Sequence, residues 1–120
     1  MCQCQEGRGR EASRAPDAEA EPVSALETPL CELLGVRYPI VQTGMGWVSG
    51  ARLTAATCEA GAMGILASAT MTLPELRVAI GKVKARTSNP FGVNLLPNQA
   101  DLLDRIDVMI AEGVTVASFA

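Results

Sequence analysis

The chain has 120 residues, which suffices for one small domain with a hydrophobic core, and its 48% hydrophobic and 19% charged residues are typical of a soluble protein. A formal net charge of −3 and an aromatic content of 3% argue against a nucleic-acid or anionic-membrane partner, since both favour a basic surface. No apolar run is long enough to span a bilayer and no N-terminal segment has the pattern of a secretory signal, so we expect a cytoplasmic protein with no membrane partner.

The sequence contains four cysteines and no histidine. Cys2 and Cys4 lie in a polar N-terminal segment, whereas Cys31 and Cys58 are far from them and from each other in sequence. A zinc site would need all four thiols, which this spacing does not favour, so we predict no metal site. The missing histidine also removes the most common general base, and we assign no catalytic residue.

Residues 1–27 are rich in Glu, Arg, Ala, Ser and Pro and have almost no large apolar side chains. Such a segment cannot bury enough surface to offset the entropy of ordering, so we predict a disordered tail. Upstream sequence from a misplaced start codon is the alternative. Order is expected from Thr28, where a short helix begins with Pro29 and ends at Gly35.

Four short apolar segments, at 39–42, 64–67, 91–94 and 114–119, predict buried strands. The first full helix is expected at 50–60, ending at Gly61. We expect its inner face to consist of Leu53, Ala56, Thr57 and Ala60.

The next helix has the clearest start, because Thr72-Leu73-Pro74-Glu75 is a capping box with proline in the first turn. It is expected to end before Asn89-Pro90. The last helix shows apolar residues at helical spacing, which predict one buried face. These residues are Leu102, Leu103, Ile106, Met109 and Ile110.

Strands alternating with helices predict a parallel sheet covered by helices. The repeat length suits a (β/α)₈ TIM barrel, which needs about 250 residues to close, so residues 28–120 would form about four of its βα units. A doubly wound sheet is the alternative. Its first turn usually carries Gly-x-Gly-x-x-Gly, and here Ser49 stands where the third glycine would be, which favours the barrel.

In both folds, ligands bind at the carboxyl ends of the strands. After the first strand, Gly44 either lets a flat ligand approach the backbone or serves only a tight turn. After the second strand, Ser68 and Thr70 either line a cofactor pocket or cap the following loop.

After the third strand, Asn94 offers a donor and an acceptor that match the edge of a heterocycle such as a flavin. The alternative is that Asn94 only bonds the turn at 95–97. Ser118 has no base nearby in sequence, which argues against a nucleophile. Trp47 is expected to be a packing plug rather than a substrate platform.

These segments together resemble the nitronate monooxygenase family, formerly 2-nitropropane dioxygenases, and the related flavin-dependent enoyl-acyl-carrier-protein reductases. The similarity covers residues 28–120 in order and spacing. It rests on Thr28-Pro29-Leu30 with Leu33-Leu34-Gly35, Tyr38-Pro39-Ile40-Val41-Gln42-Thr43-Gly44-Met45, Glu59-Ala60-Gly61-Ala62-Met63-Gly64, and Asn89-Pro90-Phe91-Gly92-Val93-Asn94-Leu95.

The resemblance implies a TIM barrel that binds FMN non-covalently and oxidises alkyl nitronates with molecular oxygen. Its site residues, carried over by position, are the backbone around Thr43, Gly44 and Met45 against the flavin, Asn94 bonded to its ring, and Ser68 as a weaker candidate. The alternative substrate is an acyl thioester, handled by an enoyl-thioester reductase or dehydrogenase. The segment from Gln42 to Val48 leans towards that branch.

In the family that the sequence resembles, the catalytic histidine follows the fourth strand and the phosphate-binding loops follow strands seven and eight, and these 120 residues include neither. We therefore expect an N-terminal fragment that is inactive alone. A half barrel exposes a strand edge and an apolar face, so it should aggregate or need a partner, such as a second chain that supplies the rest of the barrel. A non-catalytic half-barrel remnant is the remaining alternative.

Overall fold

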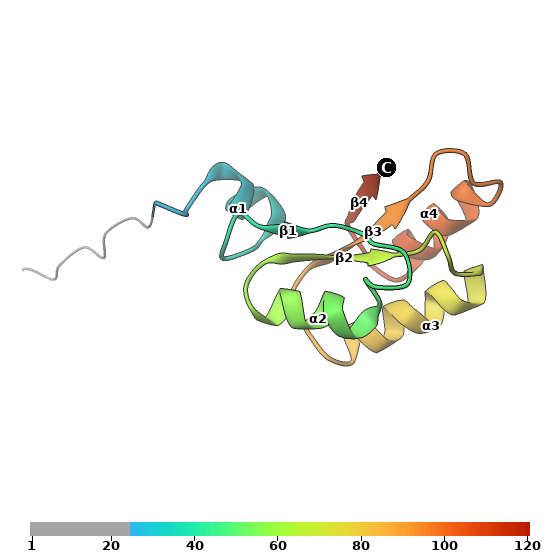
Figure 1. The fold of residues 1–120 in the computed structure, drawn as a ribbon, viewed down its shortest axis with the longest axis horizontal. Coiled ribbons are helices and arrows are strands. Elements are labelled where there is room, and N and C mark those ends of the chain that lie inside the picture. The colour runs from blue at the N-terminus through green and yellow to red at the C-terminus, as the bar shows by residue number, and fades with distance from the viewer. Residues whose placement is uncertain (1–24) are drawn as a thin grey trace, which may run out of the picture.

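The computed structural model describes residues 25–120, so most of the tail predicted to be disordered lies outside the described residues. After the short helix α1 (Pro29–Leu34), the chain alternates strands and helices: β1 (Val41–Gln42), α2 (Ala51–Glu59), β2 (Met63–Ala67), α3 (Leu73–Lys84), β3 (Phe91–Leu95), α4 (Leu102–Ala111) and β4 (Val116–Phe119). The four strands form one parallel sheet in the order β1-β2-β3-β4, and α2 and α3 lie side by side against it (Figure 1). The predicted βα repeat is confirmed.

The sheet is buried in its centre and open at its sides. Every residue of β2 and β3 is buried, whereas β1 and β4 are only partly covered. The core lies between the central strands and the helices, where Leu66 and Val93 pack with Leu76, Ile80 and Val83 of α3. Buried parallel strands satisfy their backbone groups in the ladder, so the central strands give the loops after them a rigid base.

The capping box predicted at the start of α3 is present. The Oγ1 of Thr72 accepts a hydrogen bond from the backbone N–H of Glu75, and the carboxylate of Glu75 accepts one from the backbone N–H of Thr72 at 2.7 Å. These bonds pair two amide groups that the first helical turn would otherwise leave free. The bond that the Glu75 carboxylate accepts from the Thr72 N–H, together with one from Oγ1 of Thr72 at 2.9 Å, lowers the pKa of Glu75 from its usual value.

The predicted inner face of α2 is wrong. The structure buries the neighbouring face, formed by Thr54, Ala55 and Cys58. The cause is a close helix–strand approach at Gly64 of β2, where an added Cβ would lie 2.4 Å from the main-chain oxygen of Thr54. Because α2 packs through its backbone and small side chains, its largest apolar residue, Leu53, does not mark the buried face.

The predicted buried face of α4 is partly wrong. Met109 is buried and Leu102 and Ile106 pack against the core, but Leu103 and Ile110 are 75% and 70% exposed. The helix is rotated so that Arg105, rather than a further apolar side chain, points inward.

None of the helices in the described part of the chain is long and apolar enough to cross a membrane.

Candidate functional site

The carboxyl ends of the first three strands meet at one edge of the sheet, which we call the rim and define as residues 43–49, 67–71 and 94. A Cβ added to Gly44 would lie 2.4 Å from Cβ of Asn94, and one added to Gly46 would lie 3.4 Å from Cγ2 of Thr70. Ala67 of β2 is in register with Asn94 of β3. The predicted convergence of these three segments is therefore present.

The loop after β1 is held in shape by the buried hydroxyl of Ser49. This hydroxyl donates to the main-chain oxygen of Thr43 at 3.0 Å and accepts from the N–H of Met45 at 2.9 Å and from Nε2 of Gln42 at 2.8 Å. One donor and two lone pairs are thus all used. This role of Ser49 was not predicted from the sequence, although a small hydroxyl residue just before a helix is a signal for such a local bond.

Held in this way, the loop presents unpaired backbone groups and exposed side chains. Thr43 and Met45 are exposed, and the N–H groups of Gly44 and Gly46 donate to no acceptor among the described residues. Trp47 is 90% exposed and has a φ of 58°, a left-handed conformation that is rare for a bulky residue. The prediction that Trp47 is a packing plug is therefore wrong within the described part of the chain.

Asn94 lies beneath this loop and is 5% exposed. Its Oδ1 accepts a hydrogen bond from Oγ of Ser118 at 2.9 Å, whereas its Nδ2 donates to none of residues 25–120. The turn at 95–97 does not use the Asn94 side chain, because the N–H of Leu96 donates instead to Oε1 of Gln99 at 3.3 Å. Asn94 thus keeps a free donor at the rim, and Gly44 is needed because a side chain there would collide with it.

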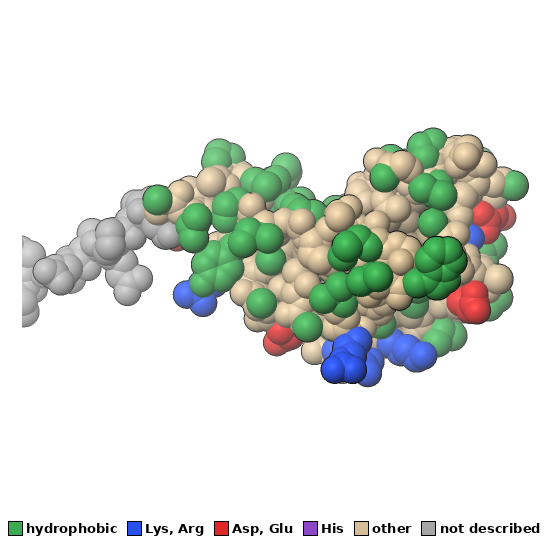
Figure 2. Space-filling view, in the orientation of Figure 1, with side chains coloured by type: hydrophobic (Ala, Val, Ile, Leu, Met, Phe, Trp, Pro, Cys, Tyr) green, Lys and Arg blue, Asp and Glu red, His purple; other side chains and the backbone are tan. Residues whose placement is uncertain are grey.

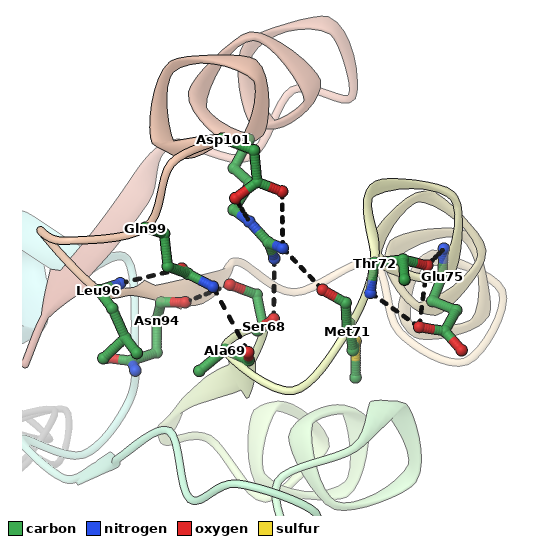
Figure 3. A network of polar contacts seen from close by, with 10 residues as sticks. Ser68, Ala69, Met71, Thr72, Glu75, Asn94, Leu96, Gln99 and Asp101 are labelled. Carbon is green, nitrogen blue, oxygen red and sulfur yellow. Dashed lines mark hydrogen bonds and ion pairs between the residues drawn. The ribbon is translucent and has the colours of Figure 1, made fainter.

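Ser68 is fully buried, and its Oγ donates to the main-chain oxygen of Asn94 at 2.5 Å (Figure 3). It therefore braces Asn94. A direct contact between Ser68 and a cofactor stays a prediction, as do the contacts assigned to Thr43, Gly44, Met45 and Asn94.

The rim carries no charged side chain among its residues 43–49, 67–71 and 94. Lys and Arg side chains gather on the side of the molecule where α2 and α3 lie, and the viewed face over the strands is largely hydrophobic or uncharged (Figure 2). Arg105 of α4 contacts the rim through the main-chain oxygens of Ser68 and Met71, and it is paired with Asp101. Their contact, with Nε of Arg105 2.8 Å from Oδ1 of Asp101, lowers the pKa of Asp101. The rim can therefore bind a polar ring by hydrogen bonds, but none of its described side chains is a general base.

No group of three residues suited to metal binding occurs within residues 25–120. Cys31 and Cys58 are separate free thiols, and Cys2 and Cys4 lie outside the described residues.

Three βα units and a fourth parallel strand, with an uncharged rim at the carboxyl ends of the strands, define the first part of a TIM-barrel protein of the α/β class. The family model for nitronate monooxygenase matches residues 27–118, and the chain belongs to this family. The family resemblance found in the sequence is thereby confirmed.

Two relatives share the name (3aS,4S,5R,7aS)-5-hydroxy-7a-methyl-1-oxo-octahydro-1H-indene-4-carboxyl-CoA dehydrogenase. The protein from Mycobacterium tuberculosis is 65% identical over 95 residues, which cover 79% of this chain and 27% of the relative. The protein from Rhodococcus jostii is 58% identical over 98 residues, which cover 82% of this chain and 28% of the relative. A nitronate monooxygenase from Paraburkholderia phytofirmans is 40% identical over 75 residues, which cover 60% of this chain and 20% of that relative. The chain thus spans less than a third of these relatives.

Solved structures agree with the fold. FabK from Thermotoga maritima superposes with a TM-score of 0.75 at 38% identity, covering 78% of this chain and 30% of FabK. Nitroalkane oxidase from Streptomyces ansochromogenes gives a TM-score of 0.67 at 29% identity, covering 75% and 35%.

Proposed function

We propose that these 120 residues form the cofactor-binding part of an FMN-dependent oxidoreductase that dehydrogenates an acyl-CoA thioester. One observation carries the choice of substrate: 65% identity over 95 residues to a relative named as a carboxyl-CoA dehydrogenase. The relatives named as nitronate monooxygenases reach 34–40% over 66–75 residues. The segment from Gln42 to Val48, which leans towards thioester-reducing relatives, points in the same direction.

The rim residues fit one edge of a flavin. The side chain of Asn94 is 5% exposed, and its Nδ2 donates to none of the described residues, so a ligand at the rim could accept a hydrogen bond from it. The N–H groups of Gly44 and Gly46 offer further donors on a loop fixed by Ser49. A bound flavin would supply a two-electron acceptor, and these donors would bind and orient its ring at the carboxyl ends of β1 and β3.

In the proposed reaction the substrate loses two hydrogens, one as a hydride and one as a proton. A base must take the proton, and this chain contains no histidine and has an uncharged rim. We therefore assign the 120 residues to cofactor binding and propose that the base comes from polypeptide outside them. On this basis the 120 residues alone are inactive and need a partner polypeptide.

Nitronate oxidation is the second candidate, because the matching family model bears that name. It predicts oxygen consumption with an alkyl nitronate. Dehydrogenation predicts reduction of an electron-accepting dye by an alicyclic hydroxyacyl-CoA without oxygen.

The test uses the gene product that contains these residues, with the 120 residues expressed alone as the control. We expect flavin absorbance in the gene product, anaerobic dye reduction with the acyl-CoA, and no turnover by the control. Turnover of the nitronate and not of the acyl-CoA would overturn the choice of substrate. A gene product without flavin would overturn the proposal as a whole, and flavin copurifying with the isolated 120 residues would show that they need no partner to bind it.

A further inference from the structure

Arg105 of α4 is a cation that the core almost completely encloses, with 4% of its surface exposed. Its Nε and Nη2 bind the two carboxylate oxygens of Asp101 at 2.8 and 2.9 Å. Its Nη1 donates to the main-chain oxygen of Ser68 at 2.8 Å, and Nη2 also donates to that of Met71 at 2.7 Å. Figure 3 labels the partners Asp101, Ser68 and Met71, and its dashed lines mark these bonds.

This arrangement does more than fill a core position. The Asp101 side chain keeps 34% of its surface exposed, so the guanidinium of Arg105 is the charge that loses its hydration. Enclosing a cation costs free energy that its hydrogen bonds must offset, which makes the choice of its other partners informative. Two of the three remaining guanidinium N–H groups donate to carbonyl groups of one segment, the loop at 68–71 between β2 and α3. Gln99 binds the same loop, since its Nε2 donates to the main-chain oxygen of Ala69 at 3.4 Å. Gln99, just before α4, and Arg105 of α4 thus hold this loop by hydrogen bonds to its main-chain oxygens.

The same loop also contacts the other two segments of the rim. Ser68 donates from Oγ to the main-chain oxygen of Asn94, and Thr70 approaches Gly46 in the loop after β1. A shift of the loop at 68–71 would therefore be transmitted to both groups of donors in the proposed flavin site.

We propose that Arg105 is a positioning residue for this site. It holds the loop at 68–71 and, through Ser68 and Thr70, fixes where the Asn94 carboxamide and the loop after β1 meet the flavin ring. Arg105 itself touches no flavin, because it is enclosed by the core. The inference rests on the proposed function, since it concerns the same flavin site.

The experiment measures flavin affinity in the gene product after removal of its flavin, by titration with FMN and quenching of flavin fluorescence. Arg105→Met removes all four hydrogen bonds, and Arg105→Lys keeps the charge but replaces the planar fork by a single ammonium. Lys84→Met is the control. Lys84 also binds a carbonyl and a carboxylate, both of Glu112 at 3.0 and 3.2 Å, but at the amino end of the sheet, far from the rim.

We expect Arg105→Met to weaken FMN binding by about tenfold or more, the loss typical of residues that orient direct ligands. The FMN affinity of Arg105→Lys should lie between those of Arg105→Met and the wild type. The absorption spectrum of the bound flavin should shift in both Arg105 variants. Lys84→Met should leave the FMN affinity and the spectrum unchanged. All variants are compared at a temperature where circular dichroism shows them folded. If the methionine variant does not fold, the lysine variant carries the test, because it too must bind FMN more weakly.

An unchanged affinity and spectrum in the Arg105 variants would overturn the inference and leave the proposed function intact. Equal losses in the Arg105 and Lys84 variants would overturn it as well, because they would reflect general destabilisation. A wild-type protein that binds no FMN would refute the proposed function itself, and this inference with it.

Discussion

Replacing Gly44 by alanine should force the first rim loop away from β3. The new methyl carbon would lie 2.4 Å from Cβ and 2.9 Å from Cγ of Asn94, whereas carbon atoms in contact are about 3.5–4.0 Å apart. One side must therefore move by about 1 Å. Asn94 is fixed in a central strand by Ser68 and Ser118, so the exposed loop moves instead. Overpacking of this kind costs about 1–3 kcal/mol.

The free energy of unfolding, measured by urea denaturation, and FMN affinity test this prediction together. The free energy of unfolding and the FMN affinity should both fall in Gly44→Ala. The moved loop would distort the hydrogen bonds of the Ser49 hydroxyl, and it would carry the Gly44 N–H away from the Asn94 carboxamide. Gly81→Ala is the matched control: an added Cβ there meets nothing within 4 Å, and alanine in a helix interior is favoured over glycine by about 0.5–1 kcal/mol. If Gly44→Ala is as stable as the wild type and binds FMN equally well, the loop does not pack on Asn94 as described.

Three further predictions concern the scaffold. Thr72→Ala removes the cap of α3 and should lower the free energy of unfolding by about 1 kcal/mol, measured by urea denaturation at neutral pH. The pKa of Glu75 is lowered from its usual 4.5 by its bonds to Thr72. The ionised carboxylate therefore stabilises the folded state above pH 4.5, and this stabilisation is lost as the pH falls below that value. Glu75→Gln should accordingly show a flatter decline in thermal midpoint between about pH 5 and 3 than the wild type. Burial raises the pKa of the Cys58 thiol, so iodoacetamide at pH 8 should label Cys58 more slowly than the half-buried Cys31 in peptide mapping; faster labelling of Cys58 would contradict its burial.

The order of elements follows from local signals that the sequence displays openly. The capping box at Thr72, the proline at the start of α1 and the short apolar strands each depend on a few neighbouring residues. The faces of α2 and α4 do not. Which side of α2 is buried depends on the absence of a Cβ at Gly64, a contact between segments that hydrophobic periodicity alone cannot reveal. The rotation of α4 likewise depends on a buried cation that periodicity counts as polar.

The candidate site likewise contains some residues that the sequence indicates and others that only the folded structure reveals. Gly44 and Asn94 stand out because a glycine and an amide at strand ends are unusual among apolar neighbours, and the structure does bring them together. Ser49 and Arg105 act through groups that only the folded chain places within reach. The spacing of Asp101 and Arg105, four residues apart on one helix, was a usable signal for an ion pair, but not for the two carbonyl groups of a distant loop.

The rim also explains why the fold and family are easier to predict than the reaction. Relatives named for a carboxyl-CoA dehydrogenase and for nitronate monooxygenases all match within this short chain, so this part of the fold is similar to proteins named for different reactions. In this chain the rim is a neutral edge with backbone and amide donors, which suits a cofactor ring and does not distinguish substrates. Discrimination requires groups that meet the substrate, and none of the rim side chains in residues 25–120 carries a charge for a carboxylate, a nitro group or a coenzyme A phosphate. A substrate assay on the gene product, rather than the geometry of the rim, therefore decides between the two proposed reactions.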